Sequence, residues 1–167
     1  MNTYQSPDKH FSIRYTTKAD SPIIHAFIKK LAIYEKLEHV MTATISQIEE
    51  SLFDLHQAEV ILAFFDEKPI GFALYFQSYS TFLGKANLYL EDLFIDEAYR
   101  KKGYGKLMFK YLAKVAVERK CERLDWMCLV WNEPSIKFYQ SLGAKHLSDW
   151  MTFRLSGDEM RVLSQIE

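Results

Sequence analysis

The chain has 167 residues, a formal net charge of −1 and 49% hydrophobic residues, and 15% of its residues are aromatic. This length fits one domain over residues 1–167, and the composition predicts a packed core rather than disorder. The nearly balanced charge argues against a general nucleic-acid or membrane-surface binder, because such proteins need a clear basic excess.

The cysteines and the N-terminus indicate the cellular compartment of the protein. Cys121 and Cys128 have neither metal-site spacing nor the number expected of a disulfide framework, and the histidines show no ligand spacing. The N-terminus is polar, and no apolar run approaches the ~20 residues needed to cross a bilayer. We therefore expect a soluble, cytoplasmic protein without a metal, a nucleic-acid partner or a membrane partner.

The first half of the chain begins with strand and helix patterns. Residues 10–16 predict a strand, and residues 19–37 predict a helix with Pro22 in its first turn. A shorter helix is predicted from Thr44, because Thr44 and Gln47 match a capping box.

Three further strands are predicted next. Residues 58–65 and 69–80 form a hairpin around the turn DEKP, and residues 85–95 follow as a third antiparallel strand. A helical period then begins near Tyr104.

The last third continues the alternation. The sequence predicts a strand over residues 123–131, a helix over 133–142 that Gly143 stops, a closing strand over 145–155 and a last helix over 157–166. The fold class is therefore α/β (α+β), with a mixed sheet and helices on its faces. The strand–helix–strand region around residues 88–130 is the part expected to be parallel.

The segment EAYRKKGYGKLM, residues 97–108, joins a predicted strand to a predicted helix. Glycines allow a ligand to approach the backbone, and the free N–H groups of a first helical turn attract an anion. Lys101, Lys102 and Lys106 would be favourable around a phosphate. The alternative is that Gly103 and Gly105 only shape a turn. Dinucleotide and nucleoside-triphosphate sites are disfavoured because their glycine motifs are missing.

The motif RKKGYG, residues 100–105, resembles the R/Q-x-x-G-x-G/A pyrophosphate loop of the GNAT acetyltransferase superfamily. The segments LAIYE, GFALYF, YLEDLFI and WNEPSIKFYQSLGA are similar, in order and spacing, to spermidine/spermine (diamine) N-acetyltransferases. The resemblance runs from about Arg14 to Ala144. It implies a GNAT fold, whose mostly antiparallel sheet has splayed central strands and helices on both faces. It also implies acetyl-CoA as co-substrate and a homodimer.

The resemblance places acetyl-CoA between strands that end near Ile95 and Val130. The backbone of Leu93, Phe94 and Ile95 would bind the pantetheine arm as an added strand does. The pyrophosphate would lie in the loop formed by Arg100, Lys101, Lys102, Gly103, Tyr104, Gly105 and Lys106.

Two further cofactor contacts are implied at the following helix, Asn132 and Ser135. The alternative for Asn132 is helix capping, with Pro134 in the first turn.

Tyr139 matches the family tyrosine that protonates the departing CoA thiolate. A phenol with a pKa near ~10 is still protonated at neutral pH, so this chemistry is reasonable. The alternative is a core residue, because Ile136, Tyr139 and Leu142 also share one helical face.

The acceptor side involves a carboxylate. Adjacent strand residues point to opposite faces, so only one of Glu91 and Asp92 is expected to face the cleft. The family pattern selects Glu91 as amine ligand and proton acceptor, which leaves Asp92 structural or solvent-facing. A base is needed because deprotonating an alkyl ammonium at pH 7 costs about 4 kcal/mol. Tyr34 and Glu35 match substrate-contact positions, although without the resemblance they would be surface residues.

The sequence departs from polyamine enzymes in two places. The stretch after Gly143 is short and has Asp149 as its only acid, and Ser80 stands where an aspartate is common. These changes predict a less acidic pocket, so a shorter diamine, a thialysine-like amino acid or another small primary amine stays open as acceptor. We expect direct acetyl transfer from acetyl-CoA to such an amine. The alternatives are a peptide or protein amine acetyltransferase and a non-catalytic acyl-CoA sensor.

Overall fold

The computed structural model describes residues 3–6 and 8–165. The chain divides into two compact units, residues 1–129 and residues 130–167. The prediction of one domain over residues 1–167 stays a prediction. Among the described residues, no helix is long and apolar enough to cross a membrane.

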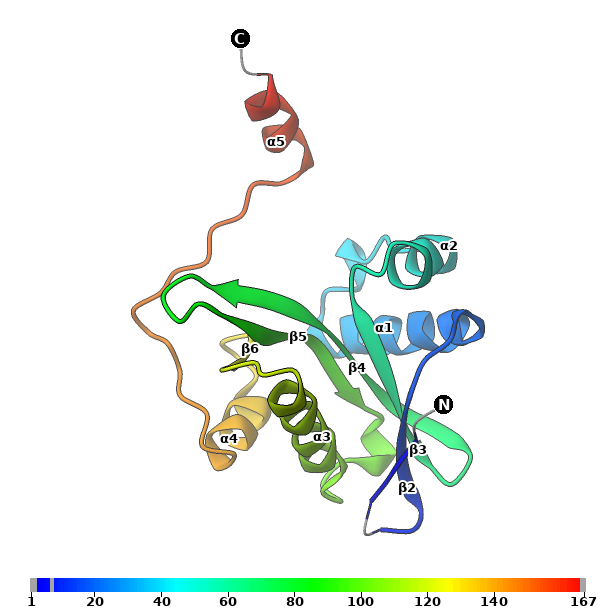
Figure 1. The fold of residues 1–167 in the computed structure, drawn as a ribbon. Coiled ribbons are helices and arrows are strands. Elements are labelled where there is room, and N and C mark those ends of the chain that lie inside the picture. Colours follow the sequence, from blue (N-terminus) through cyan, green and yellow to red (C-terminus); the bar gives the residue numbers. More distant parts are fainter. Residues whose placement is uncertain (1–2, 7, 166–167) are drawn as a thin grey trace. The chain divides into compact units, whose positions relative to one another are not determined.

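The first unit contains a six-stranded sheet whose spatial order follows the sequence (Figure 1). The strands are β1 (Thr3–Gln5), β2 (Phe11–Tyr15), β3 (Glu59–Phe65), β4 (Lys68–Ser80), β5 (Lys85–Ile95) and β6 (Leu124–Trp126). Pairing is antiparallel from β1 to β5 and parallel between β5 and β6. The predicted mixed, mostly antiparallel sheet is confirmed, whereas β1 was not predicted.

Helices lie on both faces of this sheet (Figure 1). The α-helices of the first unit are α1 (Ser21–Glu35), α2 (Ile45–Glu49) and α3 (Tyr104–Glu118). Short turns of other helical types are η1 (Lys18–Asp20), η2 (Glu38–Val40), η3 (Glu50–Asp54) and η4 (Glu97–Tyr99). The predicted cap of α2 is confirmed, because the Thr44 hydroxyl accepts a hydrogen bond from the Gln47 N–H at 3.2 Å.

The core on the α1 face contains three stacked or tilted phenylalanine rings. The Phe27 ring of α1 lies 6.0 Å from Phe72 of β4 and 6.2 Å from Phe94 of β5. Buried aromatic surface of this size contributes strongly to stability, and it fixes α1 over the C-terminal half of β5. On the opposite face, the Tyr104 ring of α3 stacks on Phe11 at 4.8 Å.

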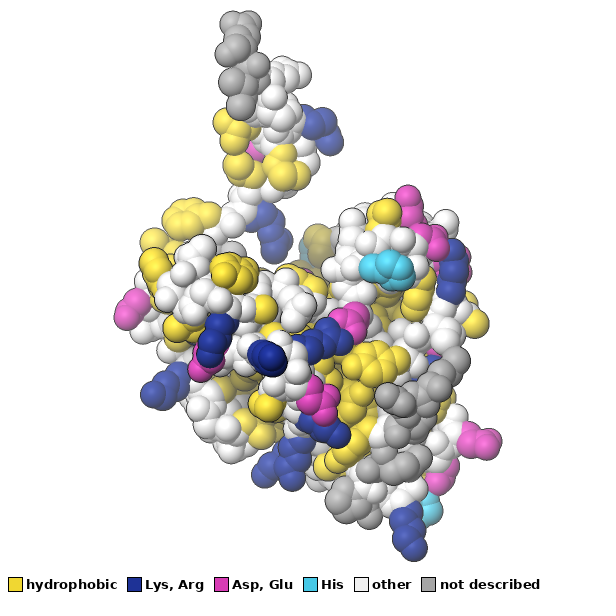
Figure 2. All heavy atoms as spheres, in the orientation of Figure 1, with side chains coloured by type: hydrophobic (Ala, Val, Ile, Leu, Met, Phe, Trp, Pro, Cys, Tyr) yellow, Lys and Arg dark blue, Asp and Glu magenta, His cyan; other side chains and the backbone are white. Residues whose placement is uncertain are grey.

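The second unit contains α4 (Glu133–Ser141) and α5 (Gly157–Ser164). Gly143 has a φ of 87°, the left-handed conformation that ends helices, so the predicted stop after α4 is confirmed. The predicted end of the last helix at Ile166 lies outside the described residues. Apolar side chains of α5 lie at its surface (Figure 2), with Val162 72% exposed.

Two strand predictions were wrong. Strand β6 ends at Trp126 rather than at residue 131, and residues 145–155 form no strand. A strand is stable only when its backbone hydrogen bonds to a neighbouring strand. Beyond Trp126 the pairing with β5 has ended, and the described part of the second unit has no other strand with which residues 145–155 could pair.

Candidate active site

The sheet opens where β5 and β6 separate. Their pairing covers only Leu88–Leu90 of β5, opposite Leu124–Trp126 of β6. Beyond Leu90, β5 keeps β4 as its neighbour on one side and has no paired strand on the other among the described residues. An open strand edge binds extended ligands through backbone hydrogen bonds. Leu93, Phe94 and Ile95 lie on this open edge, and their contact with the pantetheine arm stays a prediction.

The backbone of the RKKGYG loop leaves the first turn of α3 open. Gly103 precedes α3 with a φ of 88°, and a Cβ at this position would meet nothing within 4 Å. The Leu107 N–H donates to the Gly103 carbonyl at 3.1 Å, so the N–H groups of the preceding first-turn residues have no carbonyl within the helix to bond. With about half a positive charge from the helix dipole, this turn suits a phosphate.

The cations of this loop have different roles in the structure. Lys101, Lys102 and Lys106 are exposed, and the Lys102 ammonium lies 5.2 Å from the Tyr99 ring centre. The Arg100 side chain instead donates its Nε–H to the Ile95 carbonyl at 2.8 Å, and its guanidinium lies 4.5 Å from the Tyr34 ring centre. Arg100 thus joins the loop to β5 and α1, which leaves its backbone rather than its side chain for a phosphate.

A β-bulge changes the direction of the carboxylates in β5. Asp92 pairs with Leu74 and Leu90 pairs with Tyr75, so Glu91 is an extra residue with no partner in β4. Such a bulge breaks the strict alternation of side chains.

The face of each acid follows from its neighbours. Leu74, directly opposite Asp92, packs in the core beneath α1, so Asp92 faces α1. Phe76 follows Leu74 by two residues in β4 and so shares its face, and Tyr89 is paired with Phe76. Tyr89 therefore lies on the α1 face, and Glu91, two residues after Tyr89, lies there too. The expectation that Glu91 and Asp92 point to opposite faces was therefore wrong.

The surroundings of Asp92 are apolar and acidic. Its side chain is partly buried, and burial, followed by the charges of Glu91 and Glu35, raises its pKa to about 7. No hydrogen bond or ion pair to Asp92 occurs among the described residues. Glu91, in contrast, is exposed. We call Glu35, Glu91 and Asp92 the acidic face.

The predicted substrate contacts of α1 meet this face from one side. Burial raises the pKa of Glu35, and Glu35 in turn contributes to the raised pKa of the Cys128 thiol, after burial of that thiol. Tyr34 is partly buried beneath Arg100. The structure thus places Glu35 and Glu91 near Asp92, which sequence reasoning had assigned a structural or solvent-facing position. The substrate-binding roles of Glu35 and Glu91 stay predictions. The sequence contained a signal of the bulge, because the apolar residues 88, 90, 93 and 95 are spaced by two positions except for one spacing of three.

The second unit holds the remaining predicted residues. Asn132 is buried, and its side-chain oxygen accepts a hydrogen bond from the Ser135 N–H at 3.4 Å, which supports the capping alternative for that side chain. Tyr139 is partly buried in α4, and its ring centre lies 5.5 Å from that of Phe138. It is therefore neither a fully buried core residue nor a fully exposed one.

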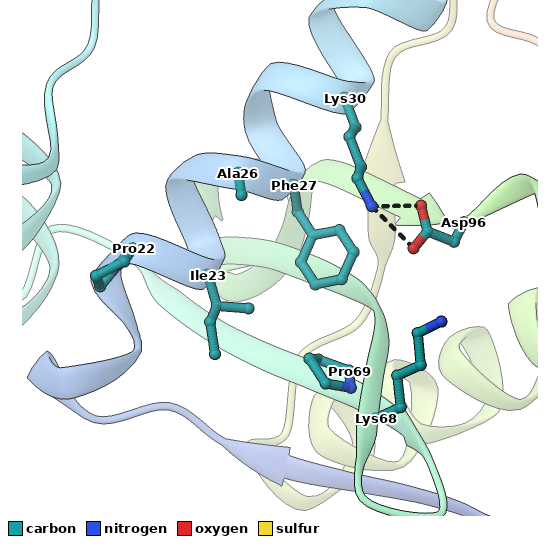
Figure 3. A pocket seen from close by; sticks show the side chains of 8 residues that line it. All are labelled: Pro22, Ile23, Ala26, Phe27, Lys30, Lys68, Pro69 and Asp96. Atoms are coloured by element: carbon teal, nitrogen blue, oxygen red, sulfur yellow. Dashed lines mark hydrogen bonds and ion pairs between the residues drawn. The ribbon is translucent and has the colours of Figure 1, made fainter.

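A separate pocket of about 390 Å³ lies against the first half of α1 (Figure 3). The Phe27 ring and Pro69 line it, and the Lys30 ammonium pairs with Asp96 at 2.8 Å. None of the site residues predicted from the sequence lines this pocket. We therefore place the candidate site at the open edge of β5, where the chemistry-bearing groups gather, and not in this apolar hollow.

The Acetyltransferase (GNAT) family profile matches residues 26–144. The chain belongs to the GNAT acetyltransferase family. The family resemblance of the RKKGYG loop is thereby confirmed, and the fold described above is a GNAT fold.

This GNAT chain has relatives along most of its length. It is 30% identical to an L-ornithine N5-acetyltransferase of Arabidopsis thaliana, over 96% of this chain and 92% of that protein. It is 32% identical to a thialysine N-epsilon-acetyltransferase of Mus musculus, over 91% of this chain and 96% of that protein. It is 33% identical to spermidine/spermine N(1)-acetyltransferase-like protein 1 of Homo sapiens, over 93% of this chain and 24% of that protein.

A solved structure has a similar fold. An integron cassette protein from the mobile metagenome of V. cholerae is similar with a TM-score of 0.78 and 26% identity, over 94% of this chain and 99% of that chain.

The acidic face predicts a stability that depends on pH in an unusual direction. Because the pKa of Asp92 is raised in the folded protein to about 7, the folded state binds its proton more tightly than the unfolded state does. The stabilisation that protonated Asp92 gives is fully present below the pKa of an unfolded aspartate, about 4, and is lost as pH rises from there through 7. Asp92→Asn should therefore stabilise the protein by up to about 4 kcal/mol at pH 8 and by less than half of that at pH 5.

Urea unfolding of both proteins at the two pH values measures this difference. Asp54→Asn is a matched control, because Asp54 is an exposed acid that pairs with Lys18. A difference between Asp92→Asn and the parent that is the same at pH 5 and pH 8 would show that Asp92 does not titrate near neutrality.

Proposed function

We propose that this GNAT chain transfers the acetyl group of acetyl-CoA directly to the primary amine of a small molecule. The observation that carries the proposal is the arrangement along β5. This strand presents an open backbone edge and two acids of the acidic face, Glu91 and Asp92, and it leads through η4 into the turn before α3 that suits an anion. One strand thus links a cradle for a phosphate-bearing thioester to a site for a cation.

The acceptor class follows from charge. The acidic face contains three carboxylates, and no cation is among the groups that shift the pKa of Asp92. Such a cluster attracts an alkyl ammonium and disfavours an anion. The relatives named above act, by their names, on ornithine, on thialysine or resemble a spermidine/spermine enzyme. Each of these acceptors carries a primary amine on a flexible alkyl chain, which supports a small amine over a protein substrate.

The cofactor residues take roles that the geometry supports. The backbone of Leu93–Ile95 holds the pantetheine arm, and the N–H groups at the start of α3 hold the pyrophosphate together with Lys101, Lys102 and Lys106. Arg100 positions the loop. Asn132 caps α4 and so fixes the backbone on which Ser135 and Tyr139 are carried.

The reaction needs no covalent enzyme intermediate. A neutral amine attacks the thioester carbonyl, and the C–S bond breaks as the tetrahedral intermediate collapses. Tyr139 donates the proton that the CoA thiolate takes up, because a phenol is still protonated at neutral pH. Glu91, with Tyr34 and Glu35, holds the incoming ammonium, and a carboxylate of the acidic face removes its proton.

A homodimer and a cytoplasmic location belong to the same proposal. Exposed apolar side chains in the second unit support an association surface, since Trp150 is 74% exposed, Met151 79% and Phe153 85%.

A direct test is a screen for CoA release with acetyl-CoA and single acceptors. The panel contains short diamines, spermidine, spermine, ornithine, thialysine and lysine-containing peptides. Turnover with small amines and none with peptides is expected. Preferential turnover of peptides would favour a protein acetyltransferase, and no turnover with any amine would favour a sensor of acyl-CoA.

The loop predicts stabilisation by acetyl-CoA. At about 100 times Kd, a ligand that binds only the folded state adds roughly 2.7 kcal/mol. Gly103→Val should abolish this gain, because a β-branched side chain would occupy the open approach above Gly103. Thermal unfolding with and without acetyl-CoA measures the gain.

Gly84→Val is the matched control for backbone strain, because Gly84 also has a positive φ, of 61°, and open space around it. It lies in the β4–β5 turn, away from the loop. Both variants should lose stability, but only Gly103→Val should lose the response to acetyl-CoA. A full response in folded Gly103→Val would refute the phosphate site.

Tyr139→Phe removes one hydroxyl and keeps the ring. It should retain the stabilisation by acetyl-CoA and lower kcat by about 10²–10⁴, the usual contribution of general acid catalysis. Steady-state kinetics with the best amine from the screen measures kcat. A kcat equal to that of the parent would show that Tyr139 is a packing residue and that the thiolate leaves without it.

A further inference from the structure

Two carboxylates of β5 reach the same face, so the proton acceptor has to be chosen between them. The bulge places Glu91 and Asp92 on the α1 side, whereas a regular strand would have sent one of them to the α3 side. Glu91 is exposed and Asp92 is partly buried opposite Leu74. The two acids therefore occupy a solvent-facing and an inner position on one face.

We propose that Asp92, rather than Glu91, is the general base that removes the proton of the acceptor ammonium, while Glu91 binds the cation at the solvent-facing position. This inference rests on the proposed function and assigns the base within that same site.

The charged and titratable groups around Asp92 explain the choice. Glu35 faces it from α1 and Glu91 from β5, and both are acids. Tyr89 lies on the same face, and burial and the charges of Glu91 and Asp125 raise its pKa. Cys128 lies beside Glu35 with a raised pKa. Both groups are therefore neutral at pH 7, and neither supplies a positive charge to Asp92.

The Arg100 guanidinium of the loop is held by other partners. Arg100 donates to the Ile95 carbonyl, and its guanidinium lies 5.1 Å from the Phe94 ring centre and also over the Tyr34 ring. It is not among the groups that act on Asp92. Burial with acidic neighbours and without a cation disfavours the carboxylate form of Asp92, and its pKa of about 7 follows.

This environment suits a base that works at neutral pH. General bases are most effective when their pKa lies near the working pH, because the group is then both ionised and strongly basic. Each unit of pKa changes the equilibrium constant for proton transfer tenfold. A carboxylate with a pKa of about 7 is therefore roughly 10³ times more favourable as acceptor than one at the ordinary value of an aspartate.

The acceptor nitrogen loses two protons in this reaction. The ammonium gives one proton to the Asp92 carboxylate and becomes a neutral amine, which attacks the thioester carbonyl. The nitrogen loses a second proton as the amide forms, and the thiolate gains one from Tyr139, which is reprotonated from that second proton through solvent. Asp92 returns its proton to solvent, so one proton is released for each ammonium consumed.

The test compares Asp92→Asn with Glu91→Gln, which are matched because each replaces one carboxylate of the face by its amide. The kcat/KM for the amine is measured from pH 5.5 to 10. In the parent it should rise tenfold per pH unit up to about 7 and then stay flat to the amine pKa. Asp92→Asn should lower it by about 10²–10⁴ at pH 7 and replace the flat region by a tenfold rise per unit, because only free neutral amine then reacts. Glu91→Gln should raise KM and keep the flat region.

The reverse result would overturn the inference. If Glu91→Gln shows the continuous rise and Asp92→Asn keeps the flat region, Glu91 is the base. If both variants keep it, neither acid is. Failure of the proposed function looks different, because the parent would then acetylate no amine, and both proposals would fall together. Urea unfolding of Asp92→Asn reports the titration of Asp92 in either case, without turnover.

Discussion

Within two successive residues, β5 loses its parallel partner and gains an extra residue. Pairing with β6 ends at Leu90, and Glu91 has no partner in β4. The first change leaves backbone groups at the edge of the sheet for an extended ligand. The second brings two acids to one face. The core beneath α1 holds both changes in place, because Phe94 packs against Phe27 just beyond them and Gly71 allows β4 to approach β5 closely at Phe94 and Ile95.

Two aspartates of this unit show how environment decides the role of the same side chain. Asp20 is buried, but Arg14 donates to both of its oxygens at 2.8 and 2.9 Å, and this pairing lowers its pKa to about 2. Asp92 has acids as neighbours and a pKa of about 7. The paired acid stabilises the fold at neutral pH, whereas the unpaired one destabilises it. A charge kept in an unfavourable place is typical of sites where reactivity matters more than stability.

Local signals predicted the local features. The capping box at Thr44, the helix stop at Gly143, the hairpin and the full length of β5 follow from short-range chemistry, and the structure confirms them. The errors concern pairing between distant segments. Residues 145–155 have the residue pattern of a strand but have no strand with which to pair among the described residues, so they form none. The face on which Asp92 lies depends on which residue of β4 is opposite it. The first helix and the loop were located by family resemblance as well as by periodicity, whereas the bulge required the register of the sheet.

The acidic face also bears on how the proposed reaction ends. The sequence predicted a pocket less acidic than that of polyamine enzymes, from the stretch after Gly143 and from Ser80, and this stays a prediction. In the first unit, Glu35, Glu91 and Asp92 form the acidic face. An ammonium is attracted to such a cluster, and acetylation converts it into a neutral amide. The product therefore loses the electrostatic attraction that held the substrate. Asp92 still holds the proton taken from the ammonium at this stage, which reduces the like-charge repulsion within the acidic face while the product leaves. When Asp92 returns that proton to solvent, the acidic face regains the charge that attracts the next ammonium.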